Sequence, residues 1–327
     1  MRINFNGSFE ETISIDNLLL AWLEFIKGKR NKPDVLIFQQ NLIDNIISLH
    51  NDLTNHLYKH RDYETFDICD PKPRTIHKAS VRDRLLHRAI YRKLYPFFDK
   101  TFSNRSFSSR KNKGIHRALN CFTLFTKKVS KNNTKTCWIL KCDIKKFFAS
   151  IDHKILTEIL VRYVPNTDIL WLLKEIIYSF NAKSNIGLPL GNLTSQLFSN
   201  IYLNELDLFV EHNLKIGYYI RYADDFAILS NDKNSLNIVL QKITELLEKE
   251  LKLSLNQDKI FIKTYASGVD FLGWIHFPHH RVLRTVTKKR ITKKLENKRK
   301  PQTIASYKGL LKHGNTYKLR KNLNLLD

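Results

Sequence analysis

The chain has 327 residues, of which 55 are Lys or Arg and 31 are Asp or Glu, giving a formal net charge of +24. This length exceeds one average domain, so we expect two or three packed subdomains, and the charge favours a polyanionic partner. The sequence has no apolar run of about 18 residues and no charged-then-apolar leader at Met1–Ile15, which argues against membrane insertion and secretion.

Two apolar stripes at helical spacing occupy the first part of the chain. The first consists of Leu19, Trp22, Leu23 and Ile26. The second follows Pro33, a residue suited to the first turn of a helix, and consists of Phe38, Leu42, Ile46, Leu49, Leu53 and Leu57. These patterns predict two helices.

A basic region and then a strand come next. Residues 70–118 are rich in Arg, Lys and His and have little continuous apolar pattern. The apolar run 137–142 leads directly into Asp143 and then into a polar and aromatic bend. Asp152 is the expected N-cap of a helix whose apolar residues are Ile155, Leu156, Ile159 and Leu160. Asp143 is therefore predicted to end a central strand.

A loop bracketed by Gly187 and Gly191 precedes a helix that is expected to begin near Thr194. Glycine permits close approach of the backbone to a neighbouring group such as a nucleotide. The predicted apolar face of the helix consists of Phe198, Ile201, Tyr202, Leu206 and Phe209.

Residues 218–230 hold two adjacent carboxylates, Asp224 and Asp225, between two apolar runs. The pattern predicts a β-hairpin with both acids near its turn. Paired carboxylates beside an apolar strand repel each other and lose hydration unless a cation neutralises them. A divalent metal site is therefore expected here, and the alternative is a solvated turn, where Asp is common.

The last part of the chain is strongly basic. A helix is predicted from Leu236, Val239, Leu240, Ile243 and Leu247. Residues 281–321 contain fifteen Lys or Arg and the single acid Glu296, which marks a third, basic unit. His276, His279 and His280 have no Cys or acid at ligand spacing and are interpreted as a surface loop.

The four cysteines follow no zinc or disulfide spacing and are interpreted as reduced, buried thiols of a cytoplasmic protein. They are Cys69, Cys121, Cys137 and Cys142.

The carboxylates predict a shared metal site. If the strand ending at Asp143 pairs beside the hairpin, Asp143, Asp224 and Asp225 converge. They could then hold two Mg²⁺ ions roughly 4 Å apart, one at a 3′-hydroxyl and one at a leaving pyrophosphate. Taken singly, Asp143 would be an ordinary strand-end residue.

The Tyr-Ala-Asp-Asp box at 222–225, with Asp143 followed five residues later by Phe148, resembles the palm of a reverse transcriptase. Other blocks occur in that family's order, at residues 72–84, 104–118, 187–196, 256–259 and 269–274. The resemblance covers residues 15–280 and implies an α+β right-hand polymerase. Its fingers would occupy residues 1–136, its palm 137–280 and its basic helical thumb 281–327.

The 187–196 block points to a subgroup. Most bacterial reverse transcriptases that resemble group II intron proteins carry Gln-Gly, three residues and Ser-Pro, whereas this chain has Leu190-Gly191, Asn-Leu-Thr and Ser195-Gln196. The departure is similar to the reverse transcriptases of diversity-generating retroelements. Their family function, mutagenic retrohoming, copies a template-repeat RNA into cDNA with frequent errors opposite adenine.

The resemblance also implies ligands and partners. Asp143, Asp224, Asp225 and the main-chain carbonyl of Ile144 would bind two Mg²⁺ ions, for which Mn²⁺ can substitute. The other partners would be template RNA, primer or cDNA, deoxynucleoside triphosphates and a small basic accessory variability protein. The setting would be the cytoplasm of a bacterium or archaeon, with phage encoding as a further source.

Three arginines are expected to clamp the incoming triphosphate, because guanidinium groups match phosphate oxygens in bidentate geometry. They are Arg74, Arg82 and Arg84. The alternative is a solvated basic face or a contact to the template backbone. Lys259 is expected to protonate the leaving pyrophosphate, and its alternative is a surface lysine.

Four further residues receive nucleotide or primer roles from the resemblance. Phe148 would exclude a ribose 2′-hydroxyl, and Tyr222 would lie under the primer end; core packing is the alternative for both. Leu190 stands where relatives place a glutamine amide against the nascent pair, so weaker base discrimination is expected. Gln196 is assigned to the same pocket, the alternative being a buried Leu190 and a helix-capping Gln196.

The basic C-terminal unit is expected to follow a nucleic-acid backbone, with a solvated face as the alternative. The residues assigned to this role are Lys288, Lys289, Arg290, Lys293 and Lys294.

Two rival interpretations remain open. A retron or phage-defence reverse transcriptase is one, although retrons would show Val-Thr-Gly where this chain has Val286-Thr287-Lys288, and also an Asn-Ala-x-x-His block before the palm. A non-catalytic RNA-binding or splicing-factor relative is the other. The three acids argue against it, because a degenerate palm has little reason to keep them.

Overall fold

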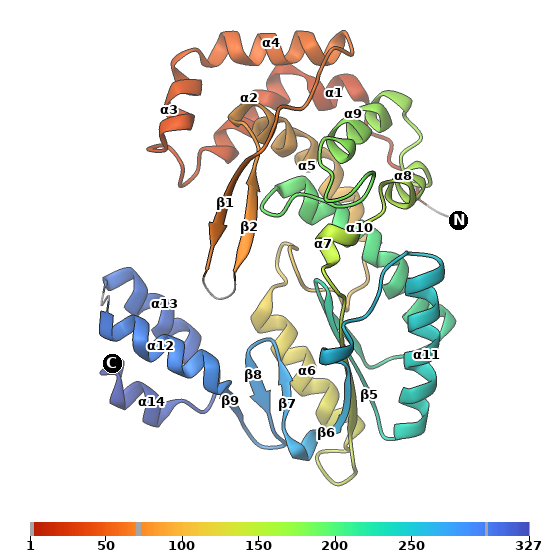
Figure 1. The fold of residues 1–327 in the computed structure, drawn as a ribbon, viewed down its shortest axis with the longest axis vertical. Helices are drawn as coiled ribbons and strands as arrows, with labels where there is room; N and C mark the ends of the chain where they lie inside the picture. The colour runs from red at the N-terminus through yellow and green to blue at the C-terminus, as the bar shows by residue number, and fades with distance from the viewer. Residues whose placement is uncertain (1–2, 70–72, 298–299, 327) are drawn as a thin grey trace. The chain divides into compact units, whose positions relative to one another are not determined.

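The computed structural model describes residues 3–69, 73–297 and 300–326 (Figure 1). Its contacts divide the chain into two compact units, each assembled from three stretches of sequence. Unit 1 consists of Met1–Asn104, Ile144–Phe209 and Glu245–Ser254, and unit 2 of Arg105–Asp143, Val210–Thr244 and Leu255–Asp327. Helices and antiparallel sheets occur together, which confirms the α+β class. The division into fingers, palm and thumb stays a prediction.

Residues 3–69 of unit 1 contain four helices where two were predicted. They are α1 (Phe9–Ile13), α2 (Ile15–Phe25), α3 (Pro33–Gln40) and α4 (Leu42–Thr54). Ser8 and Ser14 cap α1 and α2 through their side chains, and Asn41, with φ −119° and ψ 44°, separates α3 from α4. The predicted stripe is also displaced, since α2 buries Leu18 and leaves Leu23 56% exposed.

The basic region contains a hairpin and a long buried helix in unit 1. The hairpin consists of β1 (Glu64–Ile68) and β2 (Arg74–Lys78), and α5 (Val81–Thr101) follows it. The apolar residues that α5 buries include Leu85, Leu86, Ala89, Ile90, Leu94 and Phe98. Charged residues interrupt this face in the sequence, which is why it shows no continuous apolar pattern. The helix packs against α2 and α10 (Leu193–Leu208).

The rest of unit 1 positions the glycine loop. The remaining helices here are α7 (Phe147–Ser150), α8 (His153–Val161) and α9 (Thr167–Tyr178). The Asp152 carboxylate accepts a hydrogen bond from Ile155 N at 3.1 Å, which confirms the predicted cap of α8. The helix predicted near Thr194 is α10, which is buried on nearly all sides, and Phe209 begins a π-helical turn after it.

Unit 2 is built around a four-stranded antiparallel sheet in the order β4-β5-β3-β6. The strands are β3 (Trp138–Asp143), β4 (Tyr219–Tyr222), β5 (Asp225–Ser230) and β6 (Phe261–Thr264). The predicted strand before Asp143 and the predicted hairpin are thus both confirmed. The helix α11 (Lys233–Lys249) starts in unit 2 and ends in unit 1, and the 3₁₀ turn Gln257–Lys259 precedes β6.

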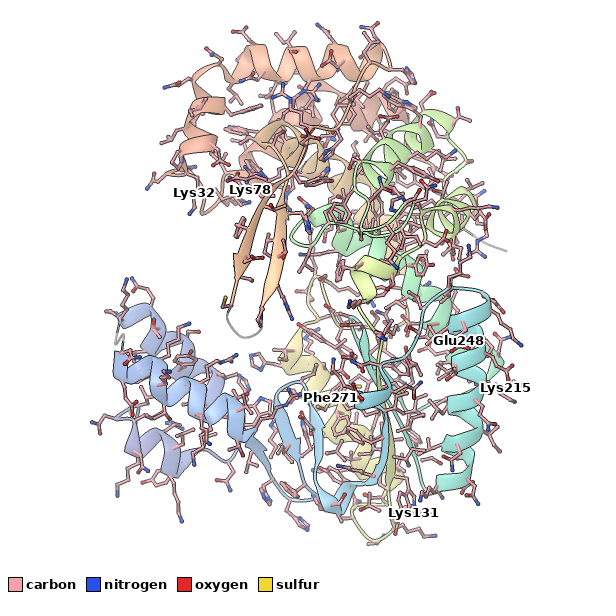
Figure 2. The ribbon with its side chains drawn as sticks, in the orientation of Figure 1. Lys32, Lys78, Lys131, Lys215, Glu248 and Phe271 are labelled. Carbon is pink, nitrogen blue, oxygen red and sulfur yellow. The ribbon has the colours of Figure 1, made fainter. Side chains whose placement is uncertain are left out.

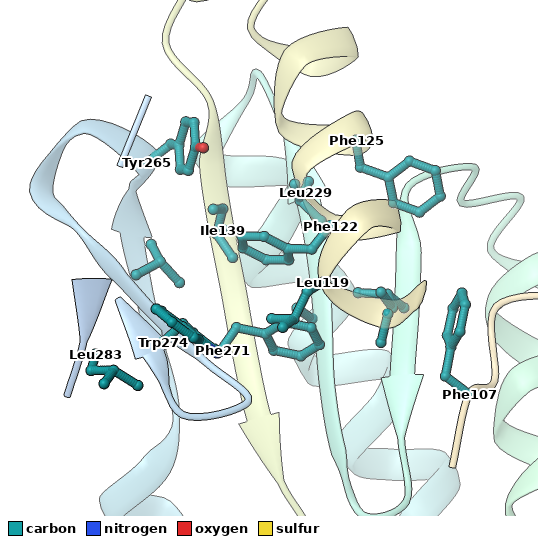
Figure 3. Close-up of a cluster of buried hydrophobic side chains, with 14 of the residues drawn as sticks. Phe107, Leu119, Phe122, Phe125, Ile139, Leu229, Tyr265, Phe271, Trp274 and Leu283 are labelled. Carbon is teal, nitrogen blue, oxygen red and sulfur yellow. The ribbon is translucent and has the colours of Figure 1, made fainter. Parts of the chain in front are cut away.

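A single buried cluster joins this sheet to the C-terminal part of unit 2 (Figure 3). The helix α6 (Ile115–Val129) packs Leu119 and Phe122 toward the sheet, and the Phe122 and Phe271 rings stack 4.8 Å apart. The C-terminal elements are β7 (Val269–Phe271), β8 (Trp274–His276), β9 (Arg281–Leu283), α12 (Thr285–Asn297), α13 (Pro301–Leu311) and α14 (Tyr317–Asn322). Ile291, Leu295 and Leu311 of these helices are buried in the cluster, each contributing about 1.5–3 kcal/mol.

Two interpretations from the sequence are wrong. His276 is 1% exposed in β8 rather than part of a surface loop, although His279 and His280 are exposed. Cys69 is exposed, whereas Cys137 and Cys142 are buried, and burial raises the pKa of both buried thiols to about 12. All four cysteines are free. No helix among the described residues is long and apolar enough to cross a membrane.

Candidate active site

Strand register in unit 2 brings two of the predicted acids together. Asp143 is the last residue of β3 and pairs directly with Asp225, the first residue of β5. Directly opposed residues in an antiparallel ladder have Cβ atoms about 4.5–5.5 Å apart. Asp224 occupies the two-residue turn with Ala223, because Tyr222 pairs with Asp225. The three carboxylates predicted from the sequence therefore gather at one end of the sheet.

The turn that carries Asp224 has a strained backbone held by a buried arginine. Ala223 has φ 55°, a left-handed conformation that a residue with a Cβ adopts only at some cost. Arg221, which is 0% exposed, donates a hydrogen bond from Nη1 to the Ala223 carbonyl at 3.1 Å. The Arg221 main chain also bonds Arg105 O and Phe107 N. Arg221 thus positions the turn, a role that β-strand periodicity does not reveal.

Asp225 has an environment that resists its ionisation. Burial raises the pKa of this carboxyl to about 6; Lys141 opposes the shift, while Asp143 and Asp224 add to it. Lys141 Nζ lies 3.1 Å from Asp225 Oδ1 and is itself 7% exposed in its side chain. That oxygen is nevertheless buried without a partner of hydrogen-bond geometry among the described residues. The ammonium group is thus close enough to attract the carboxylate, but its direction leaves Oδ1 unsatisfied.

Asp143 has a different cationic neighbour. Lys259 Nζ lies 2.6 Å from Asp143 Oδ1, and the lysine side chain is 42% exposed. The Asp143 carbonyl accepts a hydrogen bond from Asn256 N at 2.8 Å, which fixes the 3₁₀ turn of Lys259 against the end of β3. The structure therefore brings Lys259 to the carboxylates, as its predicted role requires, although the role itself stays a prediction.

The donor set at this end of the sheet fits a hard divalent cation. Carboxylate oxygens are the ligands that Mg²⁺ prefers, and the buried Asp225 Oδ1 needs a partner. With Asp143 and Asp225 each directed to a lysine, the described residues present no ready-made cluster of three acidic, His or Cys groups. Cation binding would require these lysine contacts to loosen. Ile144, the fourth predicted ligand, is 1% exposed and follows Asp143 in the chain.

Tyr222 lies beside the acids on β4 and is half-buried against the core cluster of unit 2. Burial raises the pKa of its hydroxyl, and a hydrogen bond with Ser108 opposes the shift. These contacts agree with the packing alternative for this residue. Its placement under a primer end stays a prediction.

Three segments of unit 1 that were assigned to the nucleotide pocket lie together. They are the turn of Phe148, the glycine loop and β2. Phe147 is 2% exposed and Phe148 half-buried, so Phe148 is the outward ring of the pair. The Phe148 carbonyl accepts a hydrogen bond from Leu188 N at 2.7 Å, and Leu190 O accepts one from His77 N of β2 at 3.0 Å. Leu190 is half-buried, and Gln196 is exposed in the first turn of α10, where Asn192 is the N-cap.

The two glycines make this meeting possible. Gly187 has φ 110° and Gly191 has φ 109°. A Cβ on Gly187 would lie 2.8 Å from Ala182 Cβ, and one on Gly191 would lie 2.8 Å from Ile76 Cγ2. The expected close approach of the backbone is therefore present, and in this structure it is to the protein's own chain.

Arg84 lines a basic cavity of about 490 Å³ in unit 1. Its cationic residues are Lys29, Lys32, Lys78, Arg84 and Arg88, and Lys32 and Lys78 are labelled in Figure 2. Arg84 Nη2 and Lys78 Nζ lie 2.5 Å and 3.0 Å from Asp34 Oδ2. Burial acts to raise the pKa of Asp34, but these two hydrogen bonds outweigh it and the pKa is lowered.

The surroundings of Lys29 disfavour its charged form, whereas hydrogen bonds with Glu64 and Asp34 raise the pKa of Lys78. The pKa of Lys29 is lowered by burial first and then by the charges of Arg88 and Arg84. Repulsion of this kind is relieved when an anion binds among the cations. The cavity thus suits a phosphate-bearing ligand, in agreement with either a triphosphate or a template backbone.

The other predicted cations have varied surroundings. Arg82 Nη2 lies 2.5 Å from Asp52 Oδ2 and its side chain is only 11% exposed, so it is occupied by an internal ion pair. Arg74 is exposed at the start of β2, and Lys72, the first residue of its motif, lies outside the described residues. In α12 of unit 2, Arg290 is half-buried. The exposed lysines of that helix are Lys288, Lys289, Lys293 and Lys294.

Comparison with known proteins identifies the family. Residues 67–276 match the family described as reverse transcriptase (RNA-dependent DNA polymerase), which is more than half of the chain. The chain belongs to the reverse transcriptase family. The match confirms the recognition made from the Tyr-Ala-Asp-Asp box and its accompanying blocks at this level.

Relatives include bacterial, intron-encoded and retron proteins. The chain is 26% identical to Protein YkfC of Escherichia coli (strain K12), over 65% of this chain and 64% of that protein. It is 23% identical to the Group II intron-encoded protein LtrA of Lactococcus lactis subsp. cremoris, over 62% of this chain and 44% of that protein. It is 25% identical to the Retron Ec73 reverse transcriptase of Escherichia coli, over 46% of this chain and 53% of that protein. The chain thus spans less than two thirds of the length of each relative.

Proposed function

We propose that this reverse transcriptase family member is an RNA-directed DNA polymerase that adds deoxynucleotides to a primer 3′-hydroxyl. The observation that carries the proposal is the pairing of Asp143 with Asp225 at the end of the sheet, with Asp224 in the adjoining turn. Family membership supports the same reaction. The basic cavity of unit 1 and the net charge of +24 suit triphosphate and nucleic-acid ligands.

Each group of residues has a proposed task. Asp143, Asp224 and Asp225 would hold two Mg²⁺ ions, which when bound supply Lewis acidity to the attacking and leaving oxygens. Lys259, already beside Asp143, would give a proton to the leaving pyrophosphate. Arg84 would orient the triphosphate.

The test is primer extension on an RNA template with the four deoxynucleoside triphosphates and Mg²⁺. Extension that depends on RNA template, primer and divalent cation is expected. Phe148→Ala is expected to let ribonucleotides compete measurably, because the half-buried ring would no longer fill the space of a 2′-hydroxyl. Template binding without any extension would instead favour the non-catalytic relative, and an unchanged sugar preference would show that Phe148 does not select the sugar.

At a finer level, we propose that the enzyme belongs to a diversity-generating retroelement and copies a template-repeat RNA with errors opposite adenine. The support is the Leu190-Gly191 to Ser195-Gln196 variant, together with the half-buried position of Leu190 in the loop that contacts Phe148 and β2. An apolar side chain offers no hydrogen bond to the nascent base pair, so discrimination between bases falls.

Sequencing the cDNA tests this finer proposal. Misincorporation is expected to concentrate opposite template adenine, and Leu190→Gln is expected to recover part of the accuracy. A matched control is Leu188→Met, a volume-conserving change in the same loop at a residue that is 3% exposed. Errors spread evenly over all four template bases would remove the diversity-generating assignment and leave the polymerase assignment standing.

The same assignment includes a small basic accessory protein. The surface of unit 1 offers support, because α2, α3 and α4 leave large apolar side chains exposed. These are Leu20, Leu23, Leu36, Ile37, Ile43 and Ile47. The isolated chain is expected to copy its RNA poorly until the partner is added, and full activity alone would contradict the requirement.

A retron-type reverse transcriptase is the second candidate, favoured by the similarity to the Retron Ec73 reverse transcriptase. The Val286-Thr287-Lys288 sequence, in place of Val-Thr-Gly, weighs against it. The error spectrum separates the two candidates, since only the diversity-generating type is expected to err mainly at adenine.

A further inference from the structure

A second polar cavity lies in unit 2, of about 710 Å³. One wall is α6 with the loop that follows it, and the other is the connection between β8 and β9 with Tyr265. We call it the α6–β8 cavity. Its volume lies in the range of about 300–1,000 Å³ that is usual for small-molecule sites.

The α6–β8 cavity is remote from the carboxylates of unit 2. Tyr265, in its wall, donates its main-chain N–H to Cys137 O at 2.8 Å, so the cavity adjoins the start of β3. Asp143 ends the same strand six residues later, which at about 3.3 Å per residue is roughly 20 Å away. A ligand bound here is therefore not the nucleotide that reacts at the acids.

The side chains of the cavity suit a base joined to a phosphate. None of the lining residues in the described part of the chain is acidic, and Lys127 and His279 are exposed at its edge. Asn120 and Asn132, also exposed, supply amides that can both donate and accept hydrogen bonds. Aromatic surface comes from Phe277, whose ring stacks on His280 at 4.9 Å with an interplanar angle of 16°.

A buried histidine adds an unsatisfied polar atom to this wall. His276 lines the cavity and is 1% exposed, and its Nε2 has no hydrogen-bond partner among the described residues. Burial, followed by the charge of Arg281, lowers the pKa of His276 to about 4. The ring is therefore neutral at pH 7 and can either donate or accept one hydrogen bond at that nitrogen, according to its tautomer.

The loop of the cavity is held in a strained, preorganised conformation. Lys131 (Figure 2), Asn132 and Asn133 are three consecutive residues with positive φ, at 47°, 57° and 69°. Ser130 Oγ accepts from Asn133 N at 2.8 Å, and Asn132 N donates to Lys127 O at 2.8 Å. Asn133 Nδ2 also donates to Pro278 O at 3.2 Å, which ties the two walls together. Strain retained in this way is typical of functional sites.

We propose that the α6–β8 cavity binds one nucleotide unit, a base with its phosphate, at a site separate from the polymerase centre. The Asn120 and Asn132 amides recognise the base edge, Phe277 and His280 provide a stacking surface, and Lys127 neutralises the phosphate. The unit is either a free nucleotide or an unpaired nucleotide of a nucleic acid. The inference does not depend on the proposed reaction at Asp143 and Asp225.

The experiment measures binding to the full chain in EDTA, with nucleoside monophosphates and a short single-stranded RNA as separate probes. Asn132→Gly removes one amide while suiting the positive φ of that position, and Lys127→Gln removes the charge. Each is expected to weaken binding by about tenfold, the effect of removing one good hydrogen bond or ionic interaction. Lys242→Gln, which removes the same charge from the exposed face of α11, is the matched control and is expected to have no such effect.

The outcomes separate the two sources of the nucleotide. If Asn132→Gly weakens binding of the monophosphates, the site is assigned to free nucleotides. If it weakens only the binding of RNA, the site is assigned to an unpaired nucleotide. A change in the ¹⁵N signal of the His276 ring on binding is expected in either case. Equal binding to wild type and both variants, or displacement by inorganic phosphate as efficient as by AMP, would overturn the proposal. Primer extension by Asn132→Gly on a short template is expected to stay at the wild-type level, so failure here leaves the polymerase assignment intact.

Discussion

The acidic end of the unit 2 sheet and the basic cavity of unit 1 each hold an excess of one charge beside fewer groups of the opposite charge. Three carboxylates meet two lysines at the sheet end, whereas five cations meet Asp34 and Glu64 in the cavity. In each region burial first, and then like charges, act against ionisation of one member: the pKa of Asp225 is raised and that of Lys29 is lowered. We therefore expect a ligand of the opposite charge to stabilise each region.

Removal of a carboxylate should have the largest effect. Asp143→Ala or Asp224→Ala is expected to lower Mg²⁺-dependent cDNA synthesis by at least about 10³-fold, because the variant lacks the charge that would bind the metals. Binding of RNA and the circular dichroism spectrum should be retained. Asp258→Asn, an exposed acid beside Lys259, is the control and should remain active. Residual synthesis near the wild-type rate in either variant would contradict the proposed metal-binding role of the acids.

The pH dependence of stability should report the strain at Asp225. The folded state keeps a proton on this carboxyl up to about pH 6, whereas the ordinary value is 3.8, so between these values the folded protein binds more protons. The free energy of unfolding therefore falls as the pH rises through this window, by up to roughly 3 kcal/mol at about 1.4 kcal/mol per pH unit.

Urea unfolding of metal-free protein at pH 4.5 and pH 7 measures this contribution. Asp225→Asn is expected to lose it, and Asp258→Asn is expected to keep it. An identical change with pH in wild type and Asp225→Asn would show that Asp225 ionises normally in the folded protein.

On the cationic side, paired substitutions should act in opposite directions. Arg84→Gln is expected to raise the KM for deoxynucleoside triphosphates by about tenfold, because it removes one charge-assisted hydrogen bond. Asp34→Asn, which removes the acid that holds Arg84 and Lys78, is expected to lower that KM. Steady-state kinetics and a separate template-binding assay distinguish the roles. A change in template affinity with unchanged KM would assign Arg84 to the template backbone.

The smallest effect is expected in α12, because its lysines are exposed to solvent, which screens their charges. Neutralising Lys289 and Lys293 should flatten the dependence of template-primer binding on salt, by about 0.9 in log-log slope for each phosphate that is no longer neutralised. The exposed Lys215 and Lys242 form the control pair. Equal slopes for both double variants would identify the α12 lysines as a solvated face.

The acidic site was predictable from the sequence because its information is local. Strand alternation and the Asp-Asp pair placed Asp224 and Asp225 at a turn, and the apolar run placed Asp143 at a strand end. Lys141 and Arg221 were not predicted, because charged residues within strands are ordinarily expected on an exposed face, and both are buried. Only the sheet register shows which acid and which carbonyl each one meets.

The basic cavity was less predictable, because its residues are brought together by contacts between distant segments. Lys29, Asp34 and Arg84 belong to different segments of the chain, and no periodicity connects them. The burial of His276 depends likewise on contacts between distant segments. The charged residues of α5 hid a helix that is buried along most of its length. The family resemblance supplied roles for Arg84 and Phe148, but not their surroundings.

The position of Asp143 opposite Asp225 depends on the length of β3. Asp143 and Asp225 occupy the final rung of a six-rung pairing that begins at Trp138 and Ser230. Inserting one residue into β3 while its start stays anchored would turn every later side chain to the opposite face of the sheet. The acid would then be displaced by about 3.3 Å along the strand and point away from Asp225. If Asp143 binds a metal as proposed, the length of β3 constrains the site as much as the identity of its last residue does.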